Sequence, residues 1–141
     1  MQNTVRKPQF FFVVLALITF IFGLLNKSGT IPIAMYNSSI DVKVWSLSLI
    51  SAAFFILIAV NYSSLSITKK PHKKVLTFLH IIFQIISIVP VFYLMIQSNI
   101  PKTYDGITTM NAILMIAFVL FLLATLIHLI NFVLSLIAKK D

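Results

Sequence analysis

The sequence of 141 residues contains no cysteine and no glutamate, and its only acidic side chains are three aspartates. The lack of cysteine excludes disulfides, thiolate metal sites and thiol catalysis. The aspartates Asp41, Asp105 and Asp141 fall outside the long apolar runs, which excludes a catalytic carboxylate pair or a carboxylate proton relay within a membrane. The serines and threonines of these runs lack a histidine–carboxylate partner set, so nucleophilic catalysis is not expected either.

Charged residues are also scarce. They make up 10% of the chain, against 60% hydrophobic residues, and the mean hydropathy is +1.04. Soluble domains carry roughly a quarter charged residues, so the composition predicts an integral membrane protein. The net charge of +8 does not indicate nucleic-acid binding, because the basic residues flank apolar runs and no basic stripe alternates with exposed aromatics.

Four apolar runs, each long enough to cross a bilayer with its flanks, predict four transmembrane helices in a single domain. We expect an all-α membrane protein of two antiparallel hairpins. The first run resembles a signal peptide, but no small-x-small cleavage site follows it, so we expect an uncleaved anchor. The predicted spans cover residues of about 10–25, 44–62, 75–96 and 110–138.

The segments around the second span carry two further expectations. Residues 26–43 are predicted to form a loop, whose apolar part from Ile31 to Tyr36 should lie on the membrane surface. Trp45 and Tyr62 stand near the two ends of the second span, where amphipathic rings favour the headgroup level.

Basic residues predict the orientation of the spans. Eight lie on the side of the two termini and the central Lys-Lys-Pro-His-Lys-Lys segment, and three lie in the other two loops. Lysine near apolar runs is held on the cytoplasmic side, so we expect both termini to be cytoplasmic and the protein to lie in the cytoplasmic (inner) membrane. The central cluster that fixes this topology comprises Lys69, Lys70, Lys73 and Lys74.

Two histidines, His80 and His128, are the only ionisable side chains within the spans, which makes them the candidate functional residues. Each belongs to a polar stripe at helical spacing. Such a pair fits a haem b ligand set or a proton path, and it equally fits interhelical hydrogen bonds between neutral side chains. The candidates for interhelical polar contacts are His80, Gln84, Ser87, Thr125, His128 and Asn131, with Ser135 on the same face.

Depth in the membrane favours the hydrogen-bonding interpretation. Counted from the nearest lysine at about 1.5 Å per residue, His80 lies roughly 9 Å deep and His128 roughly 16 Å deep. The two axial ligands of one haem should lie at nearly equal depth. Gln84 rather than His80 is therefore expected to be level with His128, and no cofactor or metal is expected.

From Val89 onward the sequence resembles the C-terminal end of subunit I of the haem-copper oxidases, the cytochrome c and quinol oxidase family. That family has a proline in its next-to-last helix, then a Met-Pro-Arg-Arg-Tyr turn, then a Trp-Asn step into the last helix. This chain has Pro90, the turn Ile100-Pro101-Lys102-Thr103-Tyr104, and Met110-Asn111. Upstream, Ile31 to Asn37 is similar to the family's apolar segment before its His-Asp-Thr-Tyr turn. The resemblance implies the last four helices of that subunit, in the orientation that the lysines predict.

The residues that carry the family's chemistry are missing. Its haem-ligand His-x-His positions fall on Val44 and Ser46, and its His-Asp step falls on Tyr36-Asn37. Its two propionate-binding arginines fall on Lys102 and Thr103. The copper ligands belong to a part of the family fold that the resemblance does not cover. It therefore implies a short, degenerate relative that has lost its haem ligands.

Together these observations predict a non-catalytic membrane protein, an accessory or assembly-type subunit that packs against a larger, respiratory oxidase-like complex. Two alternatives stay open: a small self-associating membrane protein without a redox role, and a haem b electron carrier that uses His80 and His128. A transporter has little support, since the spans lack a buried charge and a pair of broken helices. Small residues at helical spacing would allow close helix contacts with neighbours; they are Ala16, Thr19 and Gly23 in span one, and Ser48, Ala52 and Ala59 in span two.

Overall fold

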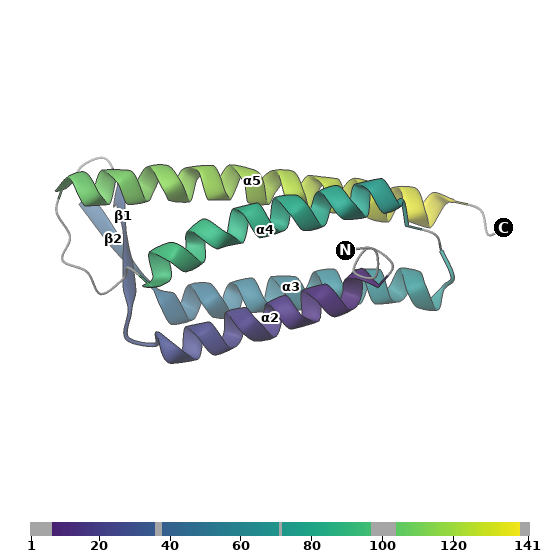
Figure 1. The fold of residues 1–141 in the computed structure, drawn as a ribbon, viewed down its shortest axis with the longest axis horizontal. Helices are drawn as coiled ribbons and strands as arrows, with labels where there is room; N and C mark the ends of the chain where they lie inside the picture. Colours follow the sequence, from purple (N-terminus) through teal and green to yellow (C-terminus); the bar gives the residue numbers. More distant parts are fainter. Residues whose placement is uncertain (1–6, 36–37, 71, 97–103, 139–141) are drawn as a thin grey trace.

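The computed structural model describes residues 7–35, 38–70, 72–96 and 104–138 of the chain. Four long helices and one two-stranded sheet account for nearly all of this part (Figure 1). In chain order the elements are α2 (Pro8–Leu25), β1 (Thr30–Met35), β2 (Ser38–Lys43), α3 (Val44–Ile67), α4 (Lys74–Ile96) and α5 (Tyr104–Ile137).

Each helix is long and apolar enough to cross a membrane. The candidate spans are Pro8–Leu25, Val44–Ile67, Lys74–Ile96 and Thr109–Ile137, of 18, 24, 23 and 29 residues. At 1.5 Å per residue the shortest is about 27 Å long, close to the ~30 Å thickness of a hydrocarbon core. The protein is thus a multi-pass membrane protein by length and composition, and the predicted fold class is confirmed.

The helices pack as two antiparallel pairs, α2 against α3 and α4 against α5 (Figure 1). The start of α2 and the end of α5 lie at the same end of the bundle, as an even number of spans requires. We call this end, which also holds the segment between α3 and α4, the lysine end. Its placement in the cytoplasm stays a prediction.

Two helices are longer than predicted. Helix α3 continues to Ile67 rather than ending near Tyr62, and α5 begins at Tyr104 rather than near Met110. The predicted boundaries followed hydropathy, which falls where serines and threonines begin. Serine and threonine lower helix stability by less than about 1 kcal/mol each relative to alanine, so the helices continue beyond their apolar segments.

A β-hairpin replaces the predicted loop between α2 and α3. Strands β1 and β2 pair antiparallel, in a register that runs from Thr30 opposite Lys43 to Met35 opposite Ser38. The backbone N–H of Val44 donates to the carbonyl of Gly29 at 2.9 Å, which closes the base of the hairpin. The alternating β-branched residues in these segments favour strands, a signal that the loop prediction did not use.

Ile31 does not lie on the membrane surface as expected. It is 1% exposed and belongs to a buried cluster with Val44, Leu94 and Met95. The hairpin therefore covers the end of the bundle opposite the lysine end. Tyr36, the last residue of the segment expected at the surface, lies outside the described residues.

Helices α2 and α3 approach closely at Gly23. A Cβ atom added there would lie 2.8 Å from Oγ of Ser48 and 3.3 Å from Cε3 of Trp45. No larger residue fits without displacement. The small residues that were predicted to permit close packing are all buried: Ala16, Thr19, Gly23, Ser48, Ala52 and Ala59.

Candidate functional site

His80 of α4 and His128 of α5 lie side by side in the interior of the bundle. Their imidazole ring centroids are 4.8 Å apart at an interplanar angle of 32°. Both side chains are buried, His80 completely and His128 with 6% of its surface exposed. The structure thus brings together the two histidines that the sequence singled out.

The expectation that these histidines lie at different depths is wrong. The side-chain amide of Asn131 donates to Oγ1 of Thr77 at 2.9 Å, and the backbone N–H of Lys73 donates to Oδ1 of Asn131 at 3.0 Å. These bonds place the first turn of α4 level with Asn131 of α5, about two turns before the end of α5. The depth estimate assumed that the lysines at the two helix ends lie at one level, whereas α5 projects beyond the start of α4.

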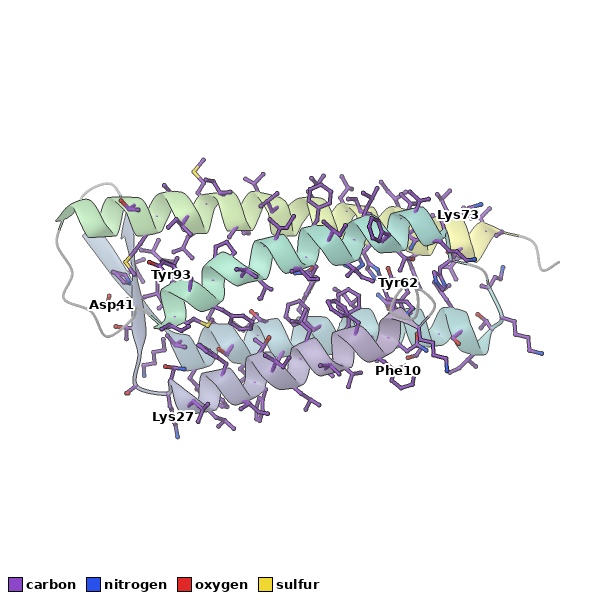
Figure 2. All side chains as sticks on the ribbon, viewed as in Figure 1. Phe10, Lys27, Asp41, Tyr62, Lys73 and Tyr93 are labelled. Atoms are coloured by element: carbon purple, nitrogen blue, oxygen red, sulfur yellow. The ribbon has the colours of Figure 1, made fainter. Side chains whose placement is uncertain are left out.

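Tyr62 of α3 links the two histidines to the first helical hairpin, which is the antiparallel pair of α2 and α3. Its hydroxyl lies 3.0 Å from Nδ1 of His80, and its ring centroid lies 5.0 Å from that of His128. Tyr62 is 2% exposed and points into the bundle at the lysine end (Figure 2). Its ring therefore faces the bundle interior, α3 continues for five residues beyond it, and its expected position at the headgroup level stays a prediction.

Helix α2 contributes Phe12, which is fully buried. Its ring is stacked on the ring of His80, with centroids 4.8 Å apart and an angle of 19°. It is also stacked on Tyr62 at 5.9 Å and 12°. All four helices therefore meet in one group of buried rings, which we call the histidine cluster: Phe12, Tyr62, His80 and His128.

The polar atoms in and beside the histidine cluster are only partly hydrogen-bonded. Nδ2 of Asn61 lies 3.2 Å from Nε2 of His128, which links α3 to α5. Nε2 of His80, Nδ1 of His128 and Oε1 of Gln84 are buried and form no hydrogen bond within the described part of the chain. Each histidine thus uses one ring nitrogen to bind the first hairpin, and the interhelical role predicted for both has a geometric basis.

The remaining predicted polar residues divide into two groups. Asn131 joins α5 to α4, as described above. Three others form hydrogen bonds within their own helices instead of between helices. In α4, Oγ of Ser87 donates to the carbonyl of Gln84 at 2.9 Å, and Nε2 of Gln84 donates to Oγ of Ser87 at 3.3 Å. In α5, Oγ1 of Thr125 donates to the carbonyl of Phe121 at 2.8 Å. Ser135 likewise donates to the carbonyl of Asn131 at 2.7 Å. Short hydroxyl side chains reach carbonyls three or four residues back more readily than a neighbouring helix.

The central cluster of lysines, which we call the lysine cluster, lies where α3 ends and α4 begins. Nζ of Lys70 donates to the carbonyls of Leu136 at 2.6 Å and Ala138 at 2.9 Å. Lys69 has a left-handed backbone, with φ of 55°, and Lys69, Lys73 and Lys74 are exposed. Their predicted role in setting the topology is compatible with this position and stays a prediction.

A haem held by His80 and His128 does not fit this geometry. A porphyrin has to lie between its two axial ligands. The two imidazole rings instead lie against each other, and Phe12 is stacked on His80. Within the described residues, no group of three or more histidine, cysteine or acidic side chains could hold a metal ion.

The sequence did not predict two members of the histidine cluster, Phe12 and Tyr62. It also did not predict two polar side chains that bind nearby, Asn61 and Thr77. Asn61 and Thr77 carried a usable signal, since a polar side chain next to an apolar run marks a buried face as readily as a helix end. Phe12 carried no such signal, because a phenylalanine ring is as favourable against lipid as in the interior of a bundle. Two segments that carry the resemblance to oxidase subunit I, Tyr36-Asn37 and residues 100–103 of the Pro101 turn, lie outside the described residues.

Comparisons with protein-family models, with curated proteins and with solved structures give no match to this chain.

Proposed function

We propose that this chain is a non-catalytic accessory or assembly-type subunit, which binds a helix of a larger membrane protein on the outer face of its first hairpin. The observation that carries the proposal is an apolar groove of about 230 Å³ between α2 and α3. Its residues are Ala16, Leu17, Phe20, Leu49, Ala52, Ala53 and Ile56.

The groove has the form of a helix-docking surface. Its floor contains the buried alanines Ala16 and Ala52, and its walls contain Leu17, Leu49 and Ile56, which are about half exposed. In a bilayer, helix association depends on close packing, and a floor of small residues permits it. Lipid chains also contact such surfaces, but they gain little from the close backbone approach that alanines allow.

The interior of the bundle supports a non-catalytic role. The histidine cluster fills the position where the four helices meet, and one ring nitrogen of each histidine is hydrogen-bonded to a side chain of α3. The chain lacks glutamate and cysteine, and Asp41 lies at the far end from the cluster (Figure 2). The histidines therefore act as interhelical contacts in this proposal, without haem or copper.

The favoured partner is a respiratory oxidase-like complex. The support is the resemblance to oxidase subunit I around Pro90 and Met110-Asn111, together with the arrangement as two antiparallel pairs. A second copy of this chain is the alternative occupant of the groove, and the protein would then be a self-associating membrane protein. Both versions place the contact on the same surface.

Co-purification in mild detergent, followed by mass spectrometry, tests the proposal. Ala53→Phe fills the groove from its exposed side and should remove the bound partner. Ala112→Phe makes the same change at an exposed alanine of α5 and should retain it. Recovery of a homo-oligomer alone would contradict the respiratory partner, and equal recovery with both variants would contradict the groove as the contact surface.

A further inference from the structure

A second cavity lies at the lysine end, where α2 begins and α3 ends. Its volume is about 270 Å³, and it opens to the surface beside the segment that joins α3 to α4. We call it the lysine pocket. It is lined by Gln9, Tyr62, Leu65, Ser66, Lys69, Lys70 and His72.

An unusual backbone conformation holds Lys69 at this pocket. The N–H of Lys69 donates to the carbonyl of Ser66 at 3.1 Å, and the N–H of Lys70 donates to the carbonyl of Leu65 at 2.9 Å. Together with the positive φ of Lys69, these bonds form a Schellman motif, a helix end whose left-handed position is usually occupied by glycine. A lysine there is less stable than a glycine, so the side chain is placed at the pocket at a cost to the fold.

Lys70 is fixed by a different contact. Its ammonium group donates to the carbonyls of Leu136 and Ala138 at the end of α5. Two of its three N–H donors are used in this way, and the third can bind a ligand. The pocket therefore has two lysines in its wall, and the ammonium group of one of them, Lys70, is held at the end of α5.

The charge around the pocket favours an anion. Within the described part of the chain, no acidic residue lines it. Ser66 and Gln9 add neutral hydrogen-bond donors at the rim. Ammonium groups and hydroxyl donors together are suited to the oxygens of a phosphate.

The depth of the pocket indicates where such a phosphate comes from. Tyr62 and Leu65 are buried residues of a membrane-spanning helix, whereas Lys69 lies just beyond its end. The pocket thus extends from the edge of the hydrocarbon layer into the headgroup layer, and basic pockets at this level between helices bind anionic headgroups. We propose that the lysine pocket binds the phosphate of an anionic phospholipid headgroup.

Native mass spectrometry of the full-length protein tests this proposal, with phosphatidylglycerol or phosphatidylcholine added at equal concentrations. Lys69→Gly removes one charge from the pocket and suits the left-handed backbone, so the fold is retained. We expect it to lower phosphatidylglycerol binding about fivefold, the effect of one lysine near an anionic surface, and to leave phosphatidylcholine binding unchanged. Lys74→Gly removes the same charge outside the pocket and should leave both unchanged.

Three results would overturn the proposal. An equal loss in Lys69→Gly and Lys74→Gly would indicate diffuse attraction to the whole lysine cluster. Unchanged phosphatidylglycerol binding in Lys69→Gly would show that the pocket does not bind the lipid. Displacement of bound phosphatidylglycerol by an equal concentration of inorganic phosphate would assign the pocket to a soluble phosphate instead of a headgroup.

Discussion

The hydroxyl of Tyr62 and Nδ1 of His80 lie 3.0 Å apart, and this hydrogen bond joins the first helical hairpin to the second inside the bundle. The two residues belong to α3 and α4, which are consecutive in the chain but belong to different antiparallel pairs. Their contact and the neighbouring contact between Asn61 and His128 bind the two pairs to each other in the interior of the bundle.

Tyr62→Phe should destabilise the protein by about 1 kcal/mol, because it removes this hydrogen bond and leaves a buried imidazole nitrogen unpaired. Unfolding in mixed detergent micelles measures the effect. Tyr93→Phe is the control, since Tyr93 is 54% exposed. Equal effects of the two changes would show that the Tyr62 hydroxyl contributes nothing to stability.

Protein produced with ample haem should show no Soret band and no sharp reduced α and β bands. The reason is the direct contact between the His80 and His128 rings, which leaves no room for a porphyrin between them. Absorption spectroscopy of the purified protein checks this expectation. A haem spectrum that disappears in both His80→Ala and His128→Ala would make the protein an electron carrier and would refute the proposed non-catalytic role.

Gly23→Ala should loosen the pairing of α2 with α3. Alanine has the better helix propensity, by about 1 kcal/mol, but its methyl group would overlap Ser48, and overpacking costs roughly 1–3 kcal/mol. We therefore expect a net loss of stability in thermal unfolding. The double variant Gly23→Ala with Ser48→Gly removes the overlapping atoms and should recover the loss; failure to recover it would show that the close approach is not the cause.

Lys69→Gly should raise the free energy of unfolding by roughly 1 kcal/mol, because glycine adopts the left-handed conformation of the Schellman motif without strain. Thermal unfolding in zwitterionic detergent, without anionic lipid, measures this gain. Lys74→Gly is the matched change outside the motif and should not stabilise the protein. A lower stability of Lys69→Gly than of the unmodified chain would contradict the strain at this position.

Reporter fusions test the orientation. A fusion at Pro71 should give a cytoplasmic signal, and fusions at Ser38 and Asp105 should give signals from the opposite side, because eight of the eleven basic residues lie with the termini and the central segment. A cytoplasmic signal from Ser38 or Asp105 would refute the predicted topology.

Hydropathy was sufficient to predict the four spans and their pairing, because each span is a nearly uninterrupted apolar run and short connections leave antiparallel neighbours. It also selected His80 and His128, the only ionisable side chains within those runs. Hydropathy could not predict how far each helix is shifted along the bundle axis relative to its neighbours. That alignment depends on specific bonds such as Asn131 to Thr77, which involve two residues 54 positions apart.

The role of Tyr62 shows a second limit. An aromatic residue near a span end has the same local sequence whether it faces the headgroups or the bundle interior. The helical continuation to Ile67 and the presence of a histidine in the facing helix decide between the two, and only the folded arrangement contains both facts. The hairpin at residues 30–43 was not predicted because Gly29, Pro32 and the Asn37-Ser38-Ser39 segment indicate a loop as readily as they indicate the ends of two short strands.

The division of hydrogen bonds between the hairpins bears on how the protein is made. Asn131 finds its partners, Thr77 and the Lys73 backbone, within the second hairpin, so that amide is satisfied as soon as α4 and α5 meet. The histidines are different, because Tyr62 and Asn61 both belong to the first hairpin. A ribosome delivers α2 and α3 to the membrane first, so the groups that bind the imidazoles are already in place when His80 and His128 enter the lipid. The order of the helices in the chain thereby shortens the time that two polar rings spend in hydrocarbon without a partner.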